Sequence, residues 1–164
     1  MEFEFSRLRR GELIAGAGGI ILLASVLLAP WYGSSAAAAL GGPSSASGWS
    51  TLSILRWLIL LDALTAVALA LSQAALRAPA LPVILSVVST VLGVPTVIAL
   101  IYRVLINLPG PEHLIDQRFG AFAGLIAAAA IVYGSFTSLR KEGLAPNDAV
   151  AVIPTVSPGA PDES

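Results

Sequence analysis

Residues 81–105 read LPVILSVVSTVLGVPTVIALIYRVL, and no charged side chain occurs in this stretch before Arg103. At a rise of 1.5 Å per residue, a helix of this length crosses the hydrocarbon core of a bilayer, which is roughly 30 Å thick. Its apolar residues do not alternate with polar ones, as they would in a strand of a membrane barrel. We therefore expect a transmembrane helix here, kinked or loosened by one turn at Pro95.

Three further apolar blocks have the same character, at residues 13–30, 54–72 and 119–139. Charged residues make up 12% of the chain, against about a quarter in a typical soluble domain. Only helices or closed barrels satisfy their backbone hydrogen bonds in lipid. The sequence therefore predicts an all-α fold: residues 13–141 form a transmembrane four-helix bundle, connected up-down-up-down because the loops are short.

Basic residues set the expected orientation of the bundle. Six of them would lie on one side of the membrane and three on the other: Arg7, Arg9, Arg10, Arg77, Arg140 and Lys141 against Arg56, Arg103 and Arg118. Loops richer in Arg and Lys stay in the cytoplasm. We therefore expect a multi-pass protein of the cell membrane with a basic cytoplasmic N-terminus, residues 1–12, and a Pro-rich, disordered cytoplasmic tail, residues 142–164.

The first apolar block has a second interpretation. Basic residues, an apolar run and the small residues 35–39 are also typical of a secretory signal peptide with its cleavage site. Cleavage would leave three spans. The run is longer than the 7–15 residues of a usual signal core, which favours a retained helix.

Asp62 lies well inside the second block, within residues 57–64, WLILLDAL. An ionised Asp at the centre of a spanning helix costs about 2.5–3.5 kcal/mol, so it must find a partner, face water or be protonated. We expect a structural ion pair with Arg103, because both residues lie in the outer half of the bundle. Arg56 lies on a different face of the helix. The alternative is a proton- or cation-binding site, as in small multidrug transporters.

Aromatic residues cluster at the outer ends of the first two blocks. They are Trp31, Tyr32, Trp49 and Trp57. Amphipathic aromatic rings favour the headgroup level, so we expect an outer-leaflet belt, with a lipid- or partner-binding surface as the alternative.

Small residues in the first and fourth blocks predict close helix contacts. The candidates are Gly16, Gly19, Gly120 and Gly124. Small side chains let helix backbones approach each other, and we expect these contacts within one chain rather than between two.

The sequence does not favour an enzyme. It has no cysteine, and its single histidine, His113, lies in a loop with Glu112 and Asp116. Ordinary loop polarity explains that group better than a metal site, and no cofactor is expected. A net charge of -1 argues against a nucleic-acid partner. We expect a structural or accessory subunit of a membrane complex, whose partners are the bilayer and another membrane protein or a second copy. The alternative is a small proton- or cation-coupled transporter that uses Asp62 and acts as a dimer.

Several short motifs resemble those of a group of small, uncharacterised four-helix membrane proteins of GC-rich bacteria. They are Arg9-Arg10-Gly11-Glu12, Ala29-Pro30-Trp31-Tyr32-Gly33, Trp57-Leu-Ile-Leu-Leu-Asp62, Pro79-Ala-Leu-Pro82 and Ile101-Tyr102-Arg103. The resemblance spans about residues 7–141 and implies a fold and a membrane location, but no activity. A fainter likeness to claudins rests on four spans and outer-loop tryptophans. The claudin loop cysteines are absent here and the loop is much shorter, so no residue role carries over.

Overall fold

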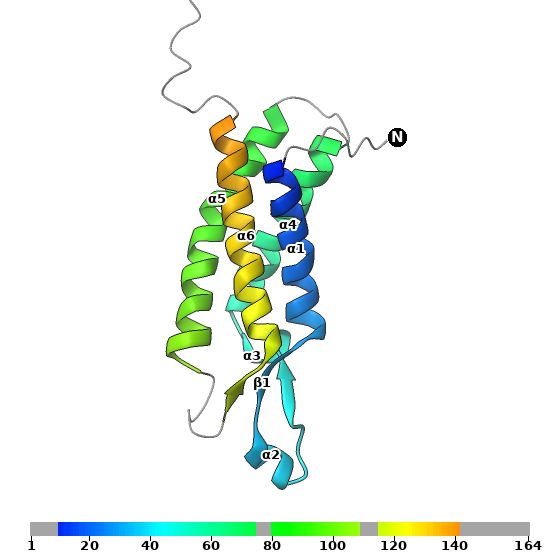
Figure 1. Ribbon diagram of the computed structural model, residues 1–164, viewed down its shortest axis with the longest axis vertical. Coiled ribbons are helices and arrows are strands. Elements are labelled where there is room, and N and C mark those ends of the chain that lie inside the picture. The colour runs from blue at the N-terminus through cyan, green and yellow to red at the C-terminus, as the bar shows by residue number, and fades with distance from the viewer. Residues whose placement is uncertain (1–9, 75–79, 109–114, 142–164) are drawn as a thin grey trace, which may run out of the picture.

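The computed structural model describes residues 10–74, 80–108 and 115–141 of the chain. Its main elements are four long helices, drawn side by side in Figure 1: α1 (Arg10–Leu28), α4 (Leu55–Ala74), α5 (Ala80–Ile101) and α6 (Phe119–Lys141). A π-helical turn, η2 (Tyr102–Ile106), extends α5. Pro95 lies inside α5 without ending it. The length and composition of these four helices suit them to crossing a membrane, which confirms the predicted apolar helices.

The helices pack as a ring in which each packs mainly against two neighbours. α1 packs against α4 and α6, and α5 packs against the same two helices from the opposite side. Figure 1 shows the start of α1 and the end of α6 at one end of the bundle. Contacts such as Gly19 with Ala63 and Gly16 with Ala70 show that α1 and α4 run antiparallel.

The outer faces of the helices are apolar. Ile20, Val91, Ile98 and Ile126 are each more than 60% exposed in the isolated chain. A helix at the surface of a soluble protein turns polar residues outwards, whereas these helices are apolar on both faces. Such a surface matches the acyl chains of lipid, and we conclude that the chain is a multi-pass membrane protein.

A small sheet closes one end of the bundle. Its strands are β1 (Pro30–Gly33), β2 (Ser45–Ser47) and β3 (Asp116–Gln117), in the antiparallel order β2-β1-β3. Two short helices, α2 (Ser35–Ala39) and α3 (Gly48–Thr51), accompany it. The all-α prediction missed this sheet. Strands of two to four residues carry no readable alternation, and their pairing joins segments that are far apart in the sequence.

Candidate functional site

The carboxyl group of Asp62 lies at the centre of the bundle. The side chain is 0% exposed and points from α4 towards Gly93 of α5. A Cβ atom built on Gly93 would lie 3.4 Å from Oδ1 of Asp62 and 2.7 Å from Cγ2 of Val132 on α6. Because Gly93 has no side chain, it leaves room for the carboxyl group where α4, α5 and α6 meet.

Neither carboxylate oxygen of Asp62 has a hydrogen-bond partner among the described residues. The hydroxyl of Thr96, one turn after Gly93, interacts with the carboxyl group but donates its hydrogen bond to the carbonyl of Leu92, at 2.8 Å. A buried carboxylate without partners is strongly disfavoured, whereas a neutral carboxylic acid loses much less on leaving water. The surroundings therefore favour the protonated acid.

The ion pair predicted between Asp62 and Arg103 is wrong. The guanidinium of Arg103 donates to the carbonyl of Asn107 at 3.2 Å. Asp62 meets α5 at Gly93, ten residues before Arg103, which corresponds to about 15 Å of helix rise. That separation exceeds the reach of an arginine side chain. The sequence could not supply the distance between the two residues.

Arg56 does not pair with Asp62 either, and contacts Trp49 and Trp57 instead. Its guanidinium lies 5.1 Å from the ring centroid of Trp49 and 5.5 Å from that of Trp57. It donates to the carbonyl of Trp49 at 3.4 Å. These cation–π contacts hold Arg56 at the capped end of α4.

Sequence reasoning missed a line of buried polar residues beside Asp62. Its members are all 0% exposed: Ser86, Ser89 and Thr96 on α5, Ser135 and Ser138 on α6, and Glu12 on α1. Ser135 donates to Ser89 at 2.8 Å, and Ser138 donates to Glu12 at 3.4 Å. The three- and seven-residue spacing of the α5 residues, which places them on one helix face, was the available signal. Glu12 escaped notice because it was assigned to a segment preceding the first span, whereas α1 begins at Arg10.

Two of the four aromatic residues predicted to form an outer-leaflet belt are buried inside the protein. Trp31 and Tyr32 are 0% and 3% exposed, and both rings belong to the buried core at the end of the bundle where β1 follows α1. Trp57 is 56% exposed and meets Trp49 edge to face, with ring centroids 5.6 Å apart. A position of these two rings at the headgroup level stays a prediction.

The four glycines predicted to mediate packing lie at tight contacts. A Cβ atom on Gly16 would lie 2.6 Å from Cβ of Ala70 on α4. A Cβ atom on Gly19 would lie 2.8 Å from the carbonyl oxygen of Ala63 on the same helix. A Cβ atom on Gly120 would meet the carbonyl of Pro30 at 2.6 Å, and one on Gly124 would meet the ring of Trp31. Gly18, one of the small residues of the first block, also makes a close contact with α6, as do Gly11 and Gly134, which the sequence did not single out.

Tyr32 provides a pH-dependent contact outside the spanning helices. Its hydroxyl donates to the carbonyl of Arg103 at 3.2 Å. Burial raises the pKa of Tyr32, and the positive charge of Arg103 lowers it by a smaller amount. A group whose pKa is raised on folding stabilises the protein below its unfolded pKa, and that stabilisation is lost as the pH rises through the folded pKa.

We therefore expect the thermal stability of the detergent-purified protein to fall steeply above about pH 10, the ordinary pKa of tyrosine. Tyr32→Phe should flatten this fall and should cost about 1 kcal/mol at neutral pH through the lost hydrogen bond. Tyr133→Phe is the control, because Tyr133 is 62% exposed. An identical alkaline transition in wild type and Tyr32→Phe would contradict the assignment.

The remaining predictions concern the loop that holds Glu112, His113 and Asp116, and the two terminal segments. Among the described residues, no three His, Cys, Asp or Glu side chains lie close enough together to hold a metal ion. Glu112 and His113 lie outside the described residues, as do residues 1–9 and the predicted tail, while Asp116 lies in β3.

No family model, curated protein or solved structure matches the chain. The resemblance to four-helix membrane proteins of GC-rich bacteria therefore stays a prediction.

Proposed function

We propose that this membrane protein couples its function to a proton that Asp62 takes up and releases, as in a small proton-coupled transporter. The observation that carries the proposal is the buried carboxyl group of Asp62, which has no hydrogen-bond partner among the described residues. A structural ion pair would have supplied a basic partner. Ionisable residues that face the interior of a membrane bundle mark proton relays and ion pathways.

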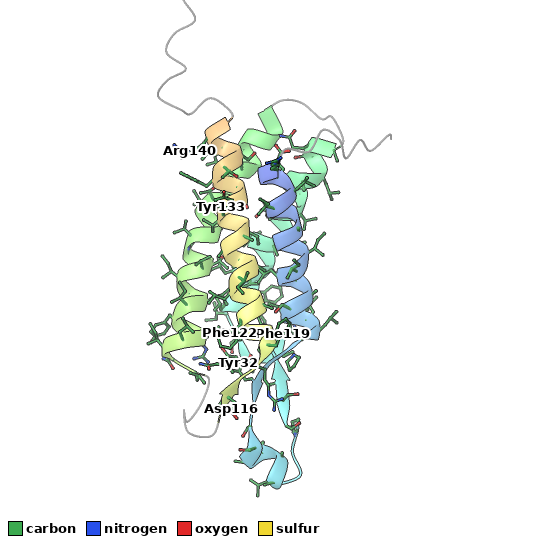
Figure 2. All side chains as sticks on the ribbon, viewed as in Figure 1. Tyr32, Asp116, Phe119, Phe122, Tyr133 and Arg140 are labelled. Atoms are coloured by element: carbon green, nitrogen blue, oxygen red, sulfur yellow. The ribbon has the colours of Figure 1, made fainter. Side chains whose placement is uncertain are left out.

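The proposed membrane orientation places both termini in the cytoplasm of a bundle that crosses the cell membrane up-down-up-down. Arg10 and Arg140 lie at the end of the bundle where α1 begins and α6 ends, while Arg103 and Arg118 lie at the end closed by the sheet. Figure 2 shows Arg140 at the end opposite Tyr32 and Asp116. The positive-inside rule, counted over the whole chain, supports this orientation.

Infrared spectroscopy of the full chain in liposomes tests the proposal without a known substrate. A protonated carboxylic acid has a carbonyl stretch that a carboxylate lacks. We expect such a band at neutral pH in the wild type, its loss at alkaline pH, and its absence in Asp62→Asn. Asp116→Asn is the matched control, because Asp116 is exposed in β3 and its removal should leave the band unchanged. A spectrum without an Asp62 acid band at any pH would refute proton binding.

The Asp62→Asn variant also distinguishes proton binding from a structural role of Asp62. Asn has the shape of the neutral acid, so Asp62→Asn should keep the thermal midpoint in detergent within a few degrees of wild type, a change of about 1 kcal/mol or less. If Asp62 instead held the bundle together through a charge, the loss would be about 3–5 kcal/mol. Substituting Arg103 as well should add no coupled effect, since the two side chains are not in contact.

A structural or accessory subunit is the second candidate. An apolar groove of about 250 Å³ lies between α1 and α4 on the outer surface and includes the small residues Gly16, Ala17, Ala70 and Ala74. Small residues allow a further helix to approach closely. Purification in mild detergent, with identification of copurifying chains, tests this candidate. A single monomeric species without a partner would argue against it.

A further inference from the structure

The polar residues beside Asp62 point to a route for its proton. We propose that the proton enters at the end of the bundle where α1 begins and passes along buried polar side chains of α1, α6 and α5 to Asp62. This inference rests on the proposed proton binding at Asp62, and it adds the path and the side of access.

The route begins at Glu12. Its side chain is 0% exposed, yet it lies only two residues after the exposed Arg10 that starts α1. Ser138 of α6 donates a hydrogen bond to its Oε1 atom at 3.4 Å. A carboxyl group at this position can exchange a proton with the nearby aqueous end of the bundle and pass one inwards.

The middle of the route lies between α5 and α6. Ser135 contacts Ser89 at 2.8 Å, and Gly93 faces Val132, so the two helices run antiparallel with a continuous register. From the Ser89–Ser135 contact towards Glu12, residue numbers therefore decrease along α5 and increase along α6. The residues three positions away in these directions are Ser86 and Ser138, both fully buried. The polar side chains thus follow one line across two helices.

The route ends at Asp62. Gly93, against which the carboxyl group lies, is four residues after Ser89, a rise of about 6 Å. The route requires a bridging water between Ser89 and Asp62, and buried water is found where several polar groups surround one site. Beyond Thr96 the same face of α5 and η2 continues with Leu100 and Val104, which are apolar and fully buried. The sheet and the buried ring of Trp31 close that end, so access to Asp62 is one-sided.

Among the described residues, the titratable groups on this line are Glu12 at its entrance and Asp62 at its end. Gly93 and Thr96 of α5 lie beside the Asp62 carboxyl group, Val132 of α6 lies beside Gly93, and none of the three carries a charge. The Glu12 carboxyl group takes a proton from a hydronium ion at the aqueous end and passes one proton on to Ser138. Each hydroxyl or water then accepts one proton and gives up its own, until the last proton binds the carboxylate of Asp62. Glu12 ends in the protonation state in which it began, and no atom other than hydrogen moves.

Hydrogen–deuterium exchange of the Asp62 carboxyl group tests the route. The full chain in liposomes is switched rapidly from H₂O to D₂O, and the shift of the acid carbonyl band is followed in time. We expect Glu12→Gln and Ser89→Ala each to slow the exchange about tenfold, because each removes one hydrogen-bonded step. The final band and its pH titration should match those of wild type. Ser89→Ala removes a single oxygen, so it provides the answer if Glu12→Gln does not fold.

Ser25→Ala is the matched control. Ser25 is also buried and hydrogen-bonded, to the carbonyl of Gly120 at 2.6 Å, but it lies near the sheet-capped end and off the route. In Ser25→Ala, the Asp62 carboxyl group should exchange at the wild-type rate. Wild-type exchange rates in both Glu12→Gln and Ser89→Ala, or equal slowing in Ser25→Ala, would overturn the route while leaving proton binding at Asp62 intact. Absence of the Asp62 acid band would instead overturn the proposed function, and the route with it.

Discussion

Replacing Trp31 by alanine should lower the free energy of unfolding by about 3–5 kcal/mol, the usual effect of removing a large buried ring. The ring is 0% exposed and fills the space between β1 and the ends of α1 and α6. Gly48, Gly120 and Gly124 each leave room for it, because a Cβ atom at any of them would lie within 3 Å of a ring atom. Its Nε1 atom also donates to the carbonyl of Ser25 at 2.8 Å. Thermal and denaturant unfolding in detergent would measure the loss.

Two variants make this prediction specific. Trp31→Phe keeps an aromatic ring but loses the hydrogen bond to Ser25, so its effect should be intermediate. Trp57→Ala removes the same atoms from a side chain that is 56% exposed, and its effect in detergent should be small. Equal losses for Trp31→Ala and Trp57→Ala would show that Trp31 does not support the capped end of the bundle.

Gly134→Leu should prevent the bundle from forming. A Cβ atom at Gly134 would lie 2.5 Å from the backbone nitrogen of Ala15 and from the carbonyl oxygen of Gly11. Backbone atoms cannot swing aside as a flexible side chain does, so α1 and α6 would have to separate. Even Gly134→Ala should cost about 1–3 kcal/mol or more, the range for overpacked cores. Size-exclusion chromatography would detect the loss of monodisperse protein.

Ala129→Leu is the control for Gly134→Leu. It adds a larger side chain to the same helix at an exposed position, so chromatography and thermal stability should stay close to wild type. A normal yield and midpoint for Gly134→Leu would mean that α1 and α6 do not pack as closely as the structure shows. The Glu12–Ser138 contact, which crosses the same pair of helices, would then lose its support as well.

The apolar helices were predictable because their signal is local. A block such as residues 81–105 needs no knowledge of its neighbours to be recognised as a membrane span, since length and hydropathy decide whether it prefers lipid. The burial of Asp62 in the membrane-spanning region was predictable for the same reason, because its position within an apolar block can be read from the sequence without knowing how the helices pack. The sequence alone thus determined four apolar helices, a membrane location and one buried carboxyl group.

The partners of these residues depended on tertiary structure. The Asp62–Arg103 pair was inferred from their common half of the bundle, but the register of α4 against α5 places Gly93, not Arg103, beside the carboxyl group. Trp31 was expected near the headgroups, but the antiparallel sheet turns it inwards. Glu12 and the serines of α5 and α6 form one line only because three helices bring them together. Hydropathy is a property of each segment, whereas register and side-chain pairing are properties of the packed helices, and these decide whether a buried charge finds a partner or a proton.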